Sequence, residues 1–251
     1  MVFSGDLALV AACERRIVNA WPAIDKLMMD GWVVRLAGGY SARANSASPM
    51  LPGARLDAPL LAVIEATYRA AGLQPTVRVT PLADQSVDAV LAARGYRQRD
   101  ASWGMIAPLT PGPVTTGGVR LEGSASTEWV RGVSALQEGS KRNADAALME
   151  IVGRVQLPAA FATLVEGGRP VGFGMSVVES GMAEIGSLVI DPAVRGRGLG
   201  RILVQTLMGW AHAEGAQQAY LQVEETNRGA LALYRSLGFA ELYRYRTMVA
   251  G

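Results

Sequence analysis

The residues that best indicate chemistry are three arginines that alternate with glycines where an apolar stretch gives way to a helix. Asp191 and Pro192 end the apolar stretch, and the loop then reads Arg195, Gly196, Arg197, Gly198, Leu199, Gly200 and Arg201. Glycines let a backbone approach a ligand closely and turn successive N–H groups toward it. A helix N-terminus adds partial positive charge, and the guanidinium groups add full charges. The segment therefore predicts a cradle for a diphosphate.

Two common phosphate loops do not fit this segment. A Walker loop requires Gly-Lys-Ser/Thr, which is absent here. The dinucleotide fingerprint requires a third glycine where Arg201 stands, and it follows the first strand of a parallel unit. Neither condition is met, so another kind of diphosphate loop is indicated.

The loop resembles the Arg/Gln-x-x-Gly-x-Gly/Ala motif of the GNAT acetyltransferase superfamily, with Arg195, Gly198 and Gly200 at the defining positions. A second segment, Asn227 to Phe239, resembles the superfamily's Asn-x-x-Ala-x-x-Leu-Tyr-x-x-x-Gly-Phe signature. The interval between the two motifs is also typical of the family. The resemblance covers residues 119–249 and implies acetyl-CoA as co-substrate, with no metal.

The resemblance assigns roles by position. The pyrophosphate of acetyl-CoA is expected on the loop from Gly196 to Arg201, together with Arg195. The pantetheine arm is expected along the main chain of the preceding strand, where an N–H near Val189 would also face the thioester oxygen. The strand residues that the family places there are Leu188, Val189 and Ile190. Asn227 is expected to contact the pantetheine or a bound water.

Two further side chains are candidates for proton transfer. Tyr234 would protonate the departing thiolate, since a phenol is protonated at pH 7; the alternative is a core aromatic residue. Glu184, eleven residues before Arg195, is spaced like the catalytic Glu of histone-acetyltransferase-like members, and the alternative is an ordinary polar residue on a half-exposed strand. Glu224 and Glu225 are weaker candidates for the base, and His212 is expected at the surface.

The elements that position these residues follow from hydrophobic periodicity and turn residues. Glycine-containing turns at 166–170 and 180–181 predict two hairpins. Strands are expected at 119–121, 160–166, 171–179, 182–190, 219–223 and 241–249, and helices at 127–137, from 199 onward and at 227–237. This order predicts an α/β (α+β mixed) domain with a central, mostly antiparallel sheet flanked by helices.

The chain also contains an internal repeat. A Pro- and Gly-rich linker at 110–118 separates residues 1–109 from residues 119–251. Sliding the first half by 143 residues onto the second matches glycines at the ends of two predicted helices, Gly72 with Gly215 and Gly95 with Gly238. We therefore expect tandem GNAT folds.

The first copy lacks the motif residues. Pro52, Arg55 and Asp57 stand where the second copy has Arg195, Gly198 and Gly200, and Leu91 replaces Tyr234. The first half is thus expected to be a degenerate GNAT-like domain, and the chain to bind one acetyl-CoA.

The start of the chain carries two further patterns. Asp6 is expected to cap an amphipathic helix that ends near Trp21, with apolar residues such as Val10 inward. Residues 31–46 resemble a segment of two-domain bacterial GNAT proteins. Its polar and aromatic residues either line an acceptor pocket or belong to an ordinary hairpin with aromatic core residues; they are Trp32, Tyr40, Arg43 and Asn45.

Composition limits the remaining function classes. The formal net charge is +2 with scattered arginines, which argues against a nucleic-acid partner, and no apolar run is long enough to span a membrane. One cysteine, Cys13, lies outside the motif domain and favours direct attack and a cytoplasmic location. We expect an acetyl-CoA-dependent N-acetyltransferase, monomeric or homodimeric, acting on a small-molecule or peptide amine. The alternative is a non-catalytic acetyl-CoA-binding module.

Overall fold

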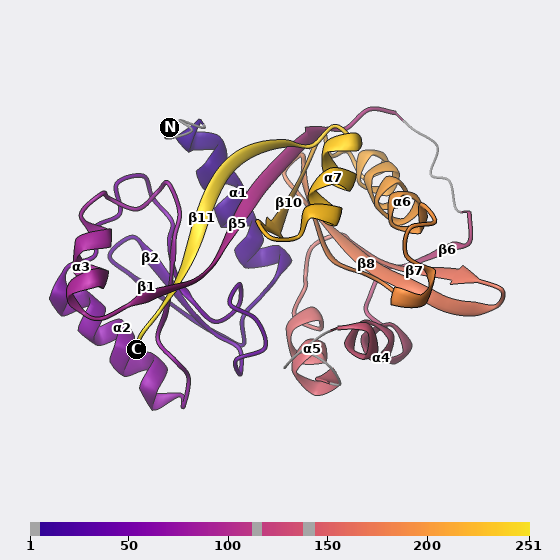
Figure 1. Ribbon diagram of the computed structural model, residues 1–251. Coiled ribbons are helices and arrows are strands. Elements are labelled where there is room, and N and C mark those ends of the chain that lie inside the picture. Colours follow the sequence, from indigo (N-terminus) through magenta and orange to yellow (C-terminus); the bar gives the residue numbers. More distant parts are fainter. Residues whose placement is uncertain (1–5, 112–116, 138–143) are drawn as a thin grey trace. The chain divides into compact units, whose positions relative to one another are not determined.

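The computed structural model describes residues 6–111, 117–137 and 144–251, so the centre of the predicted linker lies outside the described residues. The chain divides into two compact units (Figure 1). The first contains residues up to 104 with 223–226 and 241–251, and the second contains 105–222 with 227–240.

The sheet of the second unit carries both predicted motifs. Its strand order is β10-β9-β8-β7-β6, with antiparallel pairs from β6 to β9 and a parallel pair between β9 and β10. The strands are β6 (Val119–Glu122), β7 (Ala159–Glu166), β8 (Arg169–Glu179), β9 (Met182–Ile190) and most of β10 (Gln218–Glu224). The helices are α4 (Thr127–Leu136), α5 (Asp145–Val152), the short 3-10 turn η2 (Pro192–Val194), α6 (Leu199–Ala213) and α7 (Arg228–Ser236). The sequence predicted all of these except α5 and η2.

Two adjacent residues of β8 place helices on both faces of this sheet. A Cβ at Gly174 would lie within 3.4 Å of Leu203 and Leu207 of α6, whereas Gly132 of α4 lies directly against the ring of Phe173. Neighbouring residues of a strand face opposite sides. Helix α6 therefore covers one face, and α4 covers the other with α5 beside it, as Figure 1 shows. The expected mixed sheet flanked by helices is confirmed.

The first unit has the strand order β1-β2-β3-β4-β11-β5. Its elements are α1 (Leu7–Ala20), β1 (Asp25–Met29), β2 (Trp32–Leu36), β3 (Ala47–Pro49), α2 (Ala58–Ala70), β4 (Thr76–Val79), α3 (Val87–Ala93), most of β5 (Arg97–Pro108) and most of β11 (Ala240–Val249). Asp6 caps α1 as predicted, because its carboxylate accepts from the N–H groups of Ala8 and Leu9. Side chains of α2, α3 and the central strands, including Trp32, form one apolar core.

The 143-residue offset superimposes the later elements of the two halves. It carries α2 onto α6, β4 onto β10, α3 onto α7 and β5 onto β11. Gly72, Gly95, Gly215 and Gly238 end the four helices with positive φ angles of 67–88°. In each case the next residue donates its N–H to the carbonyl five residues earlier, which satisfies a helix C-terminus. The repeat predicted from sequence thus extends to the hydrogen bonds of the helix ends.

The division into units differs from the predicted boundaries at the last strand of each half. From Glu241 onward, β11 belongs to the first unit, where Arg246 to Val249 pair antiparallel with β4. Residues 105–109 belong instead to the second unit, where Leu109 donates to the carbonyl of Gln217 at 2.8 Å. The second half therefore supplies β11 to the first unit, and the first half supplies only the end of β5 to the second. Because the two strands occupy equivalent places in the repeat, their patterns do not specify which sheet each one joins.

Candidate active site

The opening beside β9 is the main feature of the second unit's sheet. The parallel register pairs Met182, Ala183 and Glu184 of β9 with residues 218–220 of β10 and extends no further in the described residues. On its other side β9 stays paired with β8, up to Ile190 opposite Gly172. Residues 187–190 are half-buried, although the rest of β9 is buried. Main-chain groups facing β10 are therefore available to an extended ligand, as a sheet edge offers them to an added strand.

A β-bulge lies where β9 parts from β10. The pairs Met175–Gly186 and Phe173–Val189 enclose two residues on β9 and one on β8, and Ser187 has a φ of +51°. Bulges re-aim side chains and bend the strand that carries them. This bulge was not predicted from the sequence. Gly186, a lone glycine within a strand pattern, was its available signal.

The loop after β9 has the backbone predicted for an anion cradle. Gly196 and Gly198 both have φ of +79°, and a Cβ at either position would meet nothing within 4 Å. Gly198 is the N-cap of α6, and no side chain caps that helix. Because the first N–H groups of a helix lack intrahelical acceptors, those of Leu199 and Gly200 can donate to an anion.

The three arginines of the loop are not equivalent. Arg197 forms two hydrogen bonds with Glu166, at 2.7 and 2.8 Å, so its charge is paired. Arg195 donates Nε to the carbonyl of Ile190 at 3.1 Å, and Arg201 donates to Ser236 Oγ at 2.7 Å. Among the described residues neither has a carboxylate partner. Arg195 and Arg201 therefore offer unpaired positive charge, whereas Arg197 offers little.

The two signature segments meet in the structure. Arg201 of the first bonds Ser236 of α7, and a Cβ at Gly200 would stand 3.3 Å from the side chain of Leu233. Beside this contact is a cavity of about 670 Å³, within the range of small-molecule sites. Its walls are α6 from Arg201 to Gly209 and residues 236–238, with Thr110 and Gly117 at the linker side.

Helix α7 presents Asn227 and Tyr234. Asn227 is the N-cap, and its Oδ1 accepts from the N–H of Ala230 at 3.1 Å. Tyr234 is 8% exposed, and its ring packs edge-on against Phe239 at 6.0 Å between centroids. The packing of a core aromatic is thus present. The general-acid role of Tyr234 stays a prediction.

Glu184 is more buried than an ordinary polar strand residue. It is 1% exposed and is the last residue of β9 that pairs with β10. Its cross-strand partner on β8 is Val177. Val177 lies on the same face of β8 as Phe173, so Glu184 is on the face that α4 covers. A Cβ at Gly186 would stand 2.7 Å from Glu184 Oε1, so the carboxylate lies against the bulge. The half-exposed alternative is wrong.

The other candidate bases lie elsewhere. Glu225, in the first unit, accepts from Arg244 at 2.7 Å, and Glu224 ends β10 in an exposed position. His212 is half-buried in the last turn of α6. No group of three or more His, Cys, Asp and Glu side chains in the described parts of the chain could hold a metal ion.

The first unit differs from the second at the positions of the motif. Asp57 caps α2, and its carboxylate accepts from the N–H of Leu60 at 2.8 Å, where a phosphate would have to bind. Leu91, at the position of Tyr234, is fully buried in the core. These contacts support the prediction that this copy has no cradle.

The residues singled out in the segment 31–46 are engaged within the first unit. Trp32 is a core residue whose indole donates to the carbonyl of Arg55 at 2.8 Å. Tyr40 is buried, and Arg43 stacks over Trp21 at 5.0 Å from the ring centroid. Asn45 accepts from two N–H groups of its own loop, at 2.6 and 3.0 Å. These contacts favour the structural interpretation over an acceptor pocket.

Comparisons with known proteins agree with the two motifs. Residues 8–248 match the family described as "Probable histone acetyltransferase Rv0428c C-terminal". The uncharacterized N-acetyltransferase YobR of Bacillus subtilis is 25% identical over 240 residues, 93% of this chain and 96% of that protein. A mycothiol acetyltransferase of Thermobispora bispora is 33% identical over 184 residues, 65% of this chain and 62% of that protein.

Solved structures share the fold. A GCN5-related N-acetyltransferase from Kribbella flavida superimposes with a TM-score of 0.68 at 17% identity, covering 98% of this chain and 96% of that one. No described helix has the length and apolar character to cross a membrane.

Proposed function

The chain belongs to the Rv0428c C-terminal acetyltransferase family of the GNAT superfamily and is an N-acetyltransferase. From this premise we propose that its second unit transfers the acetyl group of acetyl-CoA directly to an amine. The observation that carries the proposal is that β9 separates from β10 after Glu184. The end of β9 leads into the glycine-rich loop before α6, and no side chain caps the N-terminus of that helix. A thioester arm lying along β9 would have its diphosphate at the N-terminus of α6.

The proposed chemistry needs one base and one acid. The amine nitrogen attacks the thioester carbonyl carbon, and the developing oxyanion accepts from a main-chain N–H near Val189. The carbon–sulfur bond then breaks, and the thiolate takes the phenolic proton of Tyr234. Glu184 takes the proton that the amine loses, directly or through water. Attack is direct because the single thiol, Cys13, is buried outside this unit, where burial raises its pKa to about 12.

The acceptor in this proposal is a small-molecule or peptide amine. Glu184 lies on the face covered by α4, opposite the face of α6, and this supports entry of acetyl-CoA and of the acceptor from different sides. A buried free cysteine fits a reducing compartment, so we place the enzyme in the cytoplasm. We propose a monomer or a homodimer, without nucleic acid or membrane.

Turnover separates an enzyme from a non-catalytic acetyl-CoA-binding module. Acetyl-CoA is incubated with the full chain and a panel of amines, including amino acids, aminosugars and peptides with free N-termini, and release of free thiol is followed. We expect amine-dependent thiol release with at least one class. Tight acetyl-CoA binding without release across the panel would favour the binding module.

A further inference from the structure

A row of polar side chains crosses one face of the first unit's sheet. Strand β4 alternates, with Val77 and Val79 in the apolar core under α2 and α3 and Arg78 on the opposite face. The register places Arg78 beside Ser48 of β3 and Thr247 of β11, and the N–H of Arg35 bonds the carbonyl of Ser46. We call Arg35, Ser46, Ser48 and Arg78 the polar row; all four are buried.

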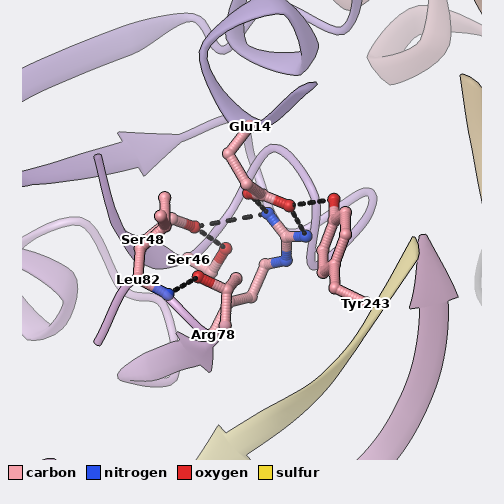
Figure 2. Close-up of polar contacts among 7 residues, drawn as sticks. Glu14, Ser46, Ser48, Arg78, Leu82 and Tyr243 are labelled. Atoms are coloured by element: carbon pink, nitrogen blue, oxygen red, sulfur yellow. Dashed lines mark hydrogen bonds and ion pairs between the residues drawn. The ribbon is translucent and has the colours of Figure 1, made fainter. Parts of the chain in front are cut away.

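The charge of Arg78 is compensated by Glu14 of α1. Its two terminal nitrogens donate to the two carboxylate oxygens of Glu14, at 2.9 and 3.1 Å, and Tyr243 donates its hydroxyl to the same carboxylate at 2.5 Å (Figure 2). The guanidinium also stacks over the ring of Tyr245, at 4.2 Å from its centroid. Glu14 is thus already bonded by Arg78 and Tyr243, and Arg78 has a bidentate partner.

The charge of Arg35 is not compensated in this way. Its side chain is 0% exposed, and its Nε, Nη1 and Nη2 have no hydrogen-bond acceptor among the described residues. Burial, and then the charge of Arg78, lower the pKa of Arg35 to about 9, so the guanidinium remains protonated at pH 7. Glu14, Tyr68, Arg43 and Arg78 are the other charged or titratable groups near it. The row and Glu14 together therefore carry one surplus buried positive charge.

The uncompensated charge of Arg35 lies in a fully buried position. A buried ion without a partner is strongly destabilising, whereas an apolar side chain of similar size is not. An anion bound to Arg35 would supply the missing partner and offset this cost.

The chain between Arg35 and Ser46 is stabilised by hydrogen bonds of its own. Asn45 accepts from the N–H groups of Ala37 and Gly39 and donates to the carbonyl of Ser41 at 2.9 Å. The hydroxyl of Tyr68 donates to the carbonyl of Arg35 at 3.1 Å. The backbone on both sides of the guanidinium is therefore fixed before any ligand binds, which lowers the entropic cost of binding.

We propose that Arg35 binds a carboxylate group of a small ligand inside the first unit. A carboxylate carries the single negative charge that the row lacks, and its two oxygens match two parallel N–H groups of a guanidinium. A phosphate dianion would exceed the surplus charge, and a chloride ion offers no paired acceptors. The site is separate from the acetyl-CoA cradle and does not depend on acetyl transfer.

Thermal unfolding of the full chain without acetyl-CoA tests this site. Sodium acetate and alanine are compared with alaninamide, which lacks the carboxylate, and with sodium chloride, all at equal ionic strength. A ligand that binds only the folded state should raise Tm by about 5–10 °C when its concentration is a hundred times its Kd. We expect such a rise with acetate or alanine only. A rise with acetate indicates a free small carboxylate, and a rise with alanine alone indicates an amino-acid ligand.

Variants identify the residue responsible. Arg35→Met removes the charge and should abolish the rise, whereas Arg35→Lys keeps the charge, loses the paired N–H groups and should weaken acetate or alanine binding at least about tenfold. Arg99→Met, at an exposed arginine of the same unit paired with Asp100, should respond like the wild type. An unchanged wild-type Tm with both carboxylates, an equal rise with chloride, or a full response in either Arg35 variant would overturn the proposal.

Discussion

Replacing Arg195 by alanine should weaken acetyl-CoA binding far more than the same change at Arg197. Arg195 is held by one bond, from its Nε to the carbonyl of Ile190, so its terminal nitrogens can reach an anion. A charge-assisted contact is worth about 1.5–3 kcal/mol. At about 1.4 kcal/mol per tenfold change, Kd should rise roughly 10- to 100-fold. Because Arg195 is exposed, salt screens the contact and values near the lower end are expected.

Arg197→Ala is the matched control from the same loop. The charge of Arg197 is already paired with Glu166, so little is lost toward a diphosphate, and Kd should change less than about threefold. Isothermal titration calorimetry at low ionic strength measures both variants. Equal effects of the two substitutions, or none in either, would refute the reasoning that distinguishes a paired from an unpaired arginine.

Two other predictions concern the second unit and the repeat. Gly186→Ala places a Cβ 2.7 Å from Glu184 Oε1 and should displace this carboxylate. We expect kcat to fall about tenfold or more, with little change in the Kd of acetyl-CoA. Gly123→Ala is the control, because a Cβ there meets nothing within 4 Å. Unchanged kcat in Gly186→Ala would remove Glu184 from the proposed reaction. Calorimetry should give one acetyl-CoA per chain, since the carboxylate of Asp57 occupies the N-terminus of α2; two equivalent sites would contradict the interpretation of the first copy as degenerate.

Local sequence signals predicted most of the elements around the site. The hairpin turns have the positive φ angles that their glycines suggest, at Gly167, Gly168 and Gly181. The helix boundaries at Thr127 and Leu199 agree with the structure, because caps and periodicity are local properties of the chain. The glycines matched by the repeat end their helices as expected.

The features that the sequence did not reveal depend on contacts between distant residues. Glu166 and Arg197 are 31 positions apart, and nothing in the local pattern of either predicts that they pair. Because β5 and β11 occupy equivalent places in the repeat, their patterns do not predict that β11 pairs with β4 of the first unit. The bonds of Arg78 to Glu14 on α1 join residues 64 positions apart, so the buried charges of the first unit became apparent only in the folded chain.

The central claim is that the second unit catalyses acetyl transfer with Tyr234 as the acid. The most direct measurement is the single-turnover rate of the Tyr234→Phe variant with an accepted amine, together with its Kd for acetyl-CoA. Phenylalanine preserves the packing against Phe239 and removes only the hydroxyl. We expect a rate roughly ten- to a thousandfold below wild type with an almost unchanged Kd. A wild-type rate in this variant would contradict it.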